Sequence, residues 1–225
     1  MNPLLRLRRT PSRTLLLVQL AAVLLYPWFD DAGGQLALTA ISAGVLWAAV
    51  WMVRKSPRAA WIAAVLAATG IIAWSAHRLS GVHALGVIGA ACYAAAFFYS
   101  ASALIAYMMQ DERTTIDEMW AAGATFMLFV EAYAWVFAGA LLLQPGAFFI
   151  PGAATQPLGW VELLFLSATN FSATGLSDIY PGSPQARMLL VVEQWNGVMY
   201  LAVVVARLAG LLRSRGKAVE RDERT

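Results

Sequence analysis

Long apolar segments, separated by short polar ones, make up most of the chain. Six of them are candidates for helices that span a membrane: roughly 14–29, 36–53, 59–76, 84–109, 120–143 and 186–212. The first is short, since a spanning helix needs about 20 residues. A further apolar segment, 158–171, is too short to cross a bilayer and runs into a polar turn, 172–178. Non-helical backbone at membrane depth is tolerated only where protein buries it or where it lines a water-filled path. The pattern therefore predicts an all-α integral membrane protein with six transmembrane helices plus a re-entrant helix and loop.

Composition supports this class. The 225 residues are 60% hydrophobic and only 13% charged, about half the charged fraction usual for soluble domains. Such a chain has too much apolar surface for a water-soluble core. The single cysteine, Cys92, can form no disulfide within the chain.

Basic residues mark one side of the predicted spans. They precede the first span and follow the second, fourth and sixth: Arg6, Arg8, Arg9, Arg13, Arg54, Lys55, Arg58, Arg113, Arg213, Arg215, Lys217, Arg221 and Arg224. Only Arg78 and Arg187 fall on the opposite side, and Arg207 lies near the end of the last span, where we expect it to extend to the membrane interface. By the positive-inside rule we expect a multi-pass protein of the plasma (inner) membrane with both termini cytoplasmic. The net charge of +3 is then a signal of topology, and no nucleic-acid partner is expected.

A polar stretch at 110–118 divides the chain. Thr115 and Glu118 fit a capping box, so a helix should begin here and continue into the fifth span. We predict three parts: a four-helix N-terminal transmembrane unit (1–113), a second unit (114–212) and a cytoplasmic tail (213–225). The fourth span lacks arginine and lysine, which argues against a voltage-sensor helix. Its many small residues, among them Gly86 and Gly89, indicate close helix packing.

The polar turn carries a recognisable motif. Residues 173–181, Ala-Thr-Gly-Leu-Ser-Asp-Ile-Tyr-Pro, resemble the P-loop of tetrameric potassium channels, whose filter reads Thr-Val-Gly-Tyr-Gly-Asp before an Ile-x-Pro turn. Gly175, Asp178, Ile179 and Pro181 are identical to that pattern. The similarity to the bacterial potassium-channel-like family with a two-helix pore domain extends from the polar stretch through Gly210.

The resemblance implies a pore domain at 114–212, built from an outer helix, a pore helix beginning at 158 or 159, a filter and an inner helix. One loop per chain implies a homotetramer, because four loops must converge on each carbonyl ring. It further implies a channel for monovalent cations, potassium above all, and no cofactor other than the permeant ions. The implied filter residues are Ala173, Thr174, Gly175, Leu176, Ser177 and Asp178. Of these, Thr174, Gly175 and Leu176 would hold the cations.

Three filter positions depart from the family pattern. Ser177 replaces the second glycine, where a left-handed backbone would cost about 1–2 kcal/mol in each chain. Ala173 replaces a threonine whose hydroxyl lines the innermost cation site. Leu176 replaces a tyrosine, so the rigidity of the loop must come from packing. Selectivity for potassium over sodium therefore stays open, although the Trk and Ktr potassium transporters, which this loop is similar to, also use one glycine per loop.

Three residues outside the filter, Glu131, Glu193 and Gly197, are candidates for gating or for support of the pore. Two interpretations stay open for Glu131, for Gly197 and for Asp178. Glu131, in the middle of the fifth span, is either a functional acid or a protonated group hydrogen-bonded to a neighbouring helix. Glu193 and Gly197 lie on the inner helix, and Gly197 marks either a bending point of a gate or close packing behind the filter. Asp178 either contributes to a ring of carboxylates at the outer mouth or hydrogen-bonds the pore helix at Trp160.

Other functions are less well supported by the sequence. A non-conducting membrane subunit or sensor that retains the channel fold is the main alternative. A carrier is disfavoured because the sequence has no inverted repeat. We expect no enzyme: His77 and His83 flank a turn without cysteine or carboxylate at ligand spacing, so no metal site is expected there.

Overall fold

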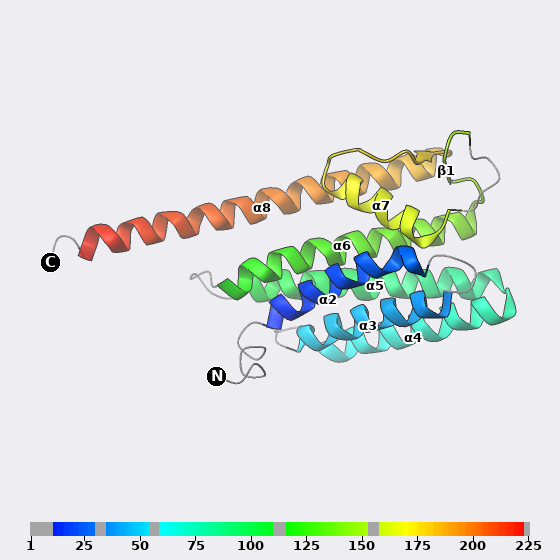
Figure 1. The fold of residues 1–225 in the computed structure, drawn as a ribbon, viewed down its shortest axis with the longest axis horizontal. Helices are drawn as coiled ribbons and strands as arrows, with labels where there is room; N and C mark the ends of the chain where they lie inside the picture. Colours follow the sequence, from blue (N-terminus) through cyan, green and yellow to red (C-terminus); the bar gives the residue numbers. More distant parts are fainter. Residues whose placement is uncertain (1–10, 30–34, 55–58, 110–115, 153–157, 223–225) are drawn as a thin grey trace.

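The computed structural model describes residues 11–29, 35–54, 59–109, 116–152 and 158–222 (Figure 1). Its elements, in chain order, are α2 (Pro11–Leu25), the 3-10 turn η1 (Tyr26–Trp28), α3 (Gln35–Val53), α4 (Ala60–Ser80), α5 (His83–Met108), α6 (Ile116–Leu143), β1 (Phe148–Phe149), α7 (Trp160–Phe171), β2 (Tyr180–Pro181) and α8 (Pro184–Asp222). The strands are two residues long and pair antiparallel. Apart from this pair the regular structure described is helical, which agrees with the all-α prediction.

Four helical stretches are long and apolar enough to cross a membrane: Ala60–Ser80, His83–Met108, Ile116–Leu143 and Pro184–Arg207. Two shorter apolar stretches, Ser12–Trp28 and Ala40–Val53, also lie in the described residues. At the usual rise the first covers about 26 Å, less than the roughly 30 Å of a hydrocarbon core. The second lies within α3, whose 19 residues cover about 29 Å. The structure thus supports a membrane protein with four spanning helices, and the other two spans stay predictions.

Local sequence signals explain where several helices begin and end. Pro27 follows the last residues of α2 and disfavours a further α-helical turn there. α4 stops at Gly81, whose φ of +72° forms a left-handed cap that bonds back to His77 O. α6 begins at Ile116 with Asp117 and Glu118 in its first turn, so the predicted helix start is confirmed. Thr115, the predicted partner of Glu118 in a capping box, lies outside the described residues.

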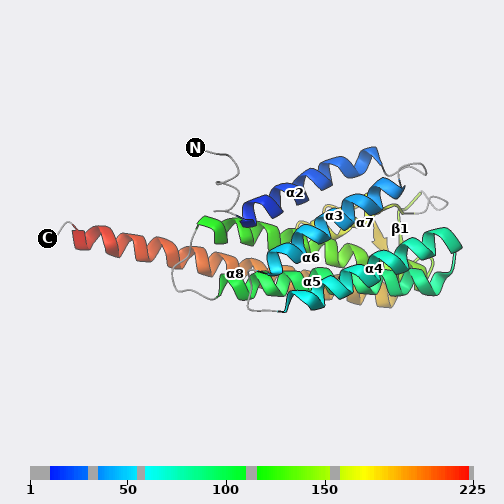
Figure 2. The same ribbon diagram turned by 90° about the horizontal axis from the view of Figure 1, so that it is seen from below.

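The helices run back and forth between two ends of an elongated bundle (Figures 1 and 2). We call the end where α6 stops and α8 starts the loop end, and the opposite one, where α2 and α6 start, the tail end. α5 and α6 form the centre of the bundle. In the apolar 18-residue segment of each helix, 50% and 56% of the residues are buried, against 22% for α4 and 17% for α8. Small residues allow this packing, since a Cβ on Gly89 would lie 2.7 Å from Trp74 N. The packing predicted for the fourth span is therefore confirmed at this position.

α8 differs from the other long helices because it projects beyond the bundle at the tail end (Figure 1). It contacts α6 and α7, yet Trp195 is 73% exposed and Met199 65% exposed. The helix also continues to Asp222, through most of the predicted tail. The boundary predicted at residue 212 therefore coincides with no break in the helix.

Candidate functional site

The segment from α7 to β2 enters the bundle from the loop end and returns to it (Figure 1). α7 is preceded by the extended Gly159 and carries Glu162 in its first turn, as predicted for the short helix. Its 12 residues span about 18 Å. Residues 172–179, which we call the return loop, then lead back to β2. Pairing of Phe148 with Pro181 holds the entry and the exit of this segment together.

One carbonyl at the end of α7 organises the return loop. Thr169 O accepts hydrogen bonds from the backbone N–H groups of Thr174 and Gly175, both at 3.0 Å. The hydroxyls of Thr174 and Ser172 donate to the same oxygen, at 3.1 and 3.2 Å. Because Leu176 replaces a tyrosine of the family pattern, the sequence predicted that packing would make the loop rigid. That residue is 76% exposed, so within one chain the hydrogen bonds to Thr169 hold the loop instead.

The backbone of the loop alternates, but at other positions than the sequence predicted. Ala173 has φ +59° and Gly175 φ +63°, whereas Ser177 is not among the residues with positive φ. The prediction of backbone strain at Ser177 is therefore wrong, and a local hydrogen bond gives the reason. Ser177 Oγ accepts the N–H of Ile179 at 3.1 Å, a serine turn that an ordinary backbone conformation permits. In the return loop, the non-glycine residue with a left-handed backbone is Ala173.

Replacement of Ala173 and Ser177 by glycine should have opposite effects. Ala173→Gly is expected to stabilise the return loop by about 1 kcal/mol per chain, because glycine adopts a positive φ without the Cβ penalty. Ser177→Gly relieves no strain and removes the acceptor of the Ile179 N–H, so it should loosen the loop. Amide hydrogen exchange at Thr174 and Gly175 should slow in the first variant and accelerate in the second. Faster exchange in Ala173→Gly would contradict the assigned backbone.

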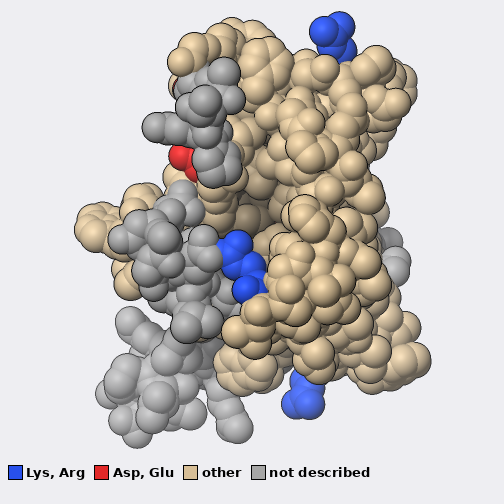
Figure 3. Space-filling view, turned by 90° about the vertical axis from the view of Figure 1, so that its right-hand side faces the viewer, with Lys and Arg blue, Asp and Glu red and all other residues tan. Residues whose placement is uncertain are grey.

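Asp178, at the end of the return loop, is exposed. No hydrogen bond joins it to Trp160 in the described part of the chain, so this interpretation of Asp178 is not supported within one chain. The Trp160 ring packs elsewhere, at 6.1 Å from the Tyr26 ring and 4.6 Å from the Trp135 ring. Figure 3, which looks onto the loop end, shows a largely uncharged surface on which basic side chains stand apart from one another.

The inner face of α8 holds the last turn of α7 through Glu193. The Glu193 side chain is fully buried. Its Oε1 lies 2.6 Å from Ser167 Oγ, and its Oε2 accepts a hydrogen bond of 2.5 Å from Asn170 Nδ2. Asn170 Nδ2 also donates to Leu190 O at 3.0 Å, so a single amide joins α7 to two consecutive turns of α8. Glu193, predicted as a residue for gating or support, thus lies behind the return loop.

Gly197 lies one turn beyond Glu193 and touches backbone. A Cβ built on Gly197 would collide with Phe171 O and lie 2.8 Å from the carbonyl carbon of Phe171, the last residue of α7. Of the two interpretations given by the sequence, this geometry supports close packing. One helical face of α8 therefore provides both the polar and the steric contact with the end of α7.

Glu131 points away from this region, toward the N-terminal helices. It is fully buried, and its Oε1 accepts a hydrogen bond of 3.3 Å from the Tyr26 hydroxyl. Its other oxygen has no partner among the described residues. One of the two interpretations left open by the sequence was a protonated Glu131 hydrogen-bonded to a neighbouring helix. The structure shows a hydrogen bond to a neighbouring element, and the protonation stays a prediction.

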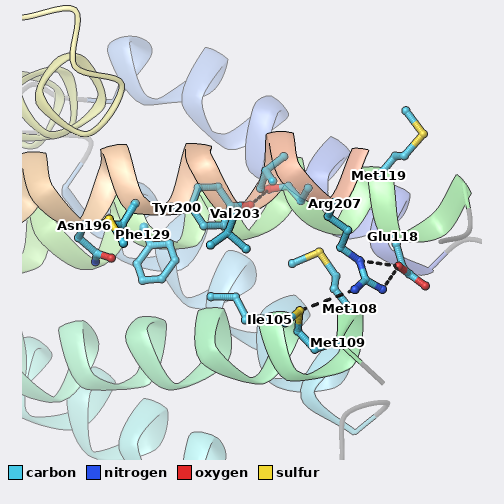
Figure 4. Close-up of a pocket in the computed structure, with 13 residues that line it drawn as sticks. Ile105, Met108, Met109, Glu118, Met119, Phe129, Asn196, Tyr200, Val203 and Arg207 are labelled. Atoms are coloured by element: carbon cyan, nitrogen blue, oxygen red, sulfur yellow. Dashed lines mark hydrogen bonds and ion pairs between the residues drawn. The ribbon is translucent and has the colours of Figure 1, made fainter. Parts of the chain in front are cut away.

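At the tail end an ion pair joins α6 to α8. Arg207 Nη2 lies 2.8 Å from Glu118 Oε2 (Figure 4). Arg207 turns toward the largely buried Glu118, and its expected extension to the membrane interface stays a prediction. The pair closes one end of a cavity of about 220 Å³ between α5, α6 and α8, lined mainly by apolar side chains such as Met108 and Phe129.

Sequence reasoning missed several of these residues. Ser167, Thr169 and Asn170 form the polar contacts of α7, and their grouping in an otherwise apolar helix was the available signal. The turn with His77 and His83 behaves as local structure, since His77 Nδ1 lies 2.8 Å from Val82 O.

Comparison with known proteins addresses the same region. Residues 118–214 match the family model described as "Ion channel". This ion-channel region begins in the first turn of α6, contains α7 and the return loop, and ends within α8. It covers a little under half of the chain, so the helices from α2 to α5 lie outside it. Neither the curated proteins nor the solved structures contain a match.

Proposed function

We propose that four copies of this chain form a membrane channel for monovalent cations. The observation that supports this most directly is the coincidence of two findings on the same residues. The ion-channel match covers 118–214, and within it the chain enters the bundle as α7 and returns through a loop to the same end. We interpret α6 as the outer helix, α7 as the pore helix, the return loop as the P-loop with its filter, and α8 as the inner helix.

The tetramer follows from the number of loops. A filter of carbonyl rings requires four converging loops, and each chain supplies one. The exposure of α8 and of the return loop in the single chain supports this assembly. Trp195 and Leu176 are 73% and 76% exposed, and in a tetramer neighbouring chains and the ion path would account for such surfaces. The lipid bilayer covers the remaining apolar faces.

The permeant ions would pass along backbone carbonyls. We assign this role to Ala173, Thr174, Gly175 and Leu176, with Ser177 and Asp178 at the outer mouth. The alternating positive φ values at 173 and 175 support the proposal, because alternation aims successive carbonyls to one side. Four copies of the exposed Asp178 would raise the local cation concentration. Potassium is the favoured ion, with selectivity over sodium to be measured.

The charges support one orientation in the membrane. Arg13 and Arg54 lie at the tail end, where α2 starts and α3 stops, while Arg78 and Arg187 lie at the loop end (Figure 1). α8 carries further basic residues in the part that extends beyond this end, so the excess of positive charge belongs to the tail end. By the positive-inside rule the tail end faces the cytoplasm. The filter would then open toward the outside of the plasma membrane.

The decisive test is the reversal potential of the purified protein in planar bilayers under opposed potassium and sodium gradients. We expect tetramers and a current that reverses close to the potassium equilibrium potential. A reversal near zero would mean a cation pore with relaxed selectivity. Well-folded tetramers without current would overturn the proposal in favour of a non-conducting subunit, and transport by monomers would indicate a carrier.

A further inference from the structure

A line of polar contacts joins α2 to α6 along their whole shared length. Ser12 N and Oγ donate to the Asp117 carboxylate at 3.2 and 2.9 Å. Two turns later Gln19 Nε2 donates to Ala124 O at 3.3 Å, and two turns after that Tyr26 reaches Glu131. We call these three contacts the polar seam. The helices lie side by side and run in the same direction (Figures 1 and 2).

The spacing of the polar seam is regular. Each contact joins residues 105 positions apart in the sequence. Successive contacts are seven residues apart, both on α6 and along α2 and the turn η1 that continues it. Two turns of an α-helix take about seven residues, so α2 and α6 remain in register from the tail end to the centre of the bundle. Ser12, Gln19 and Tyr26 are fully buried. Such contacts fix the position of α2 on α6 far better than apolar packing alone would.

The last contact of the polar seam also reaches the pore helix. The Tyr26 hydroxyl lies 3.4 Å from Ser42 Oγ of α3 as well as 3.3 Å from Glu131 Oε1 of α6. The edge of its ring meets the ring of Trp160 at a centroid distance of 6.1 Å and an angle of 76°. Trp160 is the first residue of α7. One side chain of the N-terminal helices therefore contacts α3, α6 and the start of α7.

The start of α7 depends on such ring contacts. Its N-cap residue is Gly159, which has no side chain with which to form the capping hydrogen bond that normally stabilises a helix by about 1 kcal/mol. The Trp160 ring instead packs against the rings of Tyr26 and Trp135. Aromatic pairs of this geometry contribute about 0.5–1.5 kcal/mol beyond their burial. A shift of Tyr26 would therefore remove one of the two ring contacts that position the first turn of a 12-residue helix whose other end holds the return loop.

We propose that Tyr26 is a positioning residue for the filter. Its contacts with α3, α6 and Trp160 set the position of α7 and hence of the return loop, so the N-terminal helices influence the ion path through this one side chain without lining it. This inference rests on the proposed function for its consequence in conduction, but its structural part can be measured independently.

The test is amide hydrogen exchange in purified full-length protein, comparing three variants. Tyr26→Leu removes both the hydroxyl and the ring, and it should accelerate exchange at the Thr174 and Gly175 amides by about tenfold or more, with little change in α4 and α5. Tyr26→Phe keeps the ring against Trp160 and should restore most of the protection. Gln19→Leu removes a hydrogen bond of the same seam that does not reach α7, and it should leave the return loop as in the unmodified protein.

The outcomes separate this inference from the proposed function. Unchanged loop exchange in Tyr26→Leu, or equal acceleration by Gln19→Leu, would overturn the positioning role whether or not the protein conducts. If the unmodified protein conducts, the reversal potential of Tyr26→Leu should shift toward zero while that of Gln19→Leu does not. Absence of current in the unmodified protein would contradict the proposed function alone, because the exchange experiment needs no current.

Discussion

Gly197→Ala is expected to destabilise the protein by about 3 kcal/mol or more per chain, at the upper end of the range for overpacking. The new Cβ would collide with Phe171 O, and it would also lie 3.1 Å from the Phe171 Cα. These are backbone atoms at the end of α7, which no side-chain rotation can move aside. The end of α7 must therefore shift away from α8, and the return loop shifts with it. The unfolding temperature reports the loss of stability, and the bilayer current reports the displaced return loop. Both should decrease strongly.

Gly44→Ala is the matched control for this substitution. Gly44 is an exposed residue inside α3, and a Cβ there would meet nothing within 4 Å. Since alanine is the better helix former, this variant should be stabilised by about 0.5–1 kcal/mol. A Gly197→Ala protein with unchanged stability and altered opening kinetics would contradict the packing interpretation. It would favour the bending point that the sequence left open.

Helix positions followed from local sequence, because their causes are local. The acidic residues in the first turn of α6, Pro27 after α2 and Gly81 after α4 act within a few residues of themselves. The regions 59–76 and 84–109, predicted as spans, accordingly coincide with α4 and α5 to within a few residues. The start of α7 at Trp160, next to the predicted 158 or 159, is of the same kind.

The details of the return loop could not be derived in that way. The prediction of strain at Ser177 assumed that each position keeps the conformation of the family pattern. In the structure the positive φ values are tied to a different cause, the convergence of Thr174 and Gly175 on Thr169 O. That carbonyl precedes the motif and has no side-chain signature in the sequence. A motif therefore identified the site, while the hydrogen bonds that shape it came from the preceding helix.

Long-range pairs were also out of reach. Glu131 stood out as a buried acid, but its partner Tyr26 lies 105 residues earlier. A single sequence does not show which helices are neighbours. The seven-residue spacing of Ser12, Gln19 and Tyr26 in an apolar helix was the visible part of the pattern, and it indicates a polar face without naming its partner.

Removal of the Glu193 carboxyl group should have the second large effect. Glu193→Ala would leave one N–H of Asn170 without its acceptor in a buried site, which costs about 1–3 kcal/mol, while the Ser167 hydroxyl keeps Val130 O as an acceptor at 2.8 Å. Truncation of this buried side chain also leaves a cavity, which adds to the loss. We expect a loss of about 3 kcal/mol per chain in the free energy of unfolding. Because both donors lie on α7, amide exchange at its last turn and at the return loop should accelerate together. Conduction should be lost or become unselective for the same reason.

Two variants establish that this effect comes from the contact between α8 and α7. Glu193→Gln preserves the volume and one acceptor oxygen, so it should retain most of the stability. Gln194→Ala changes the next residue of α8, which is exposed, and it should alter stability by less than about 0.5 kcal/mol. If Glu193→Ala left loop exchange unchanged, the carboxyl group would not support the loop. If Gln194→Ala acted as strongly, the exposed side of α8 would carry an equally important contact. In a tetramer, this exposed side is the face available to a neighbouring chain.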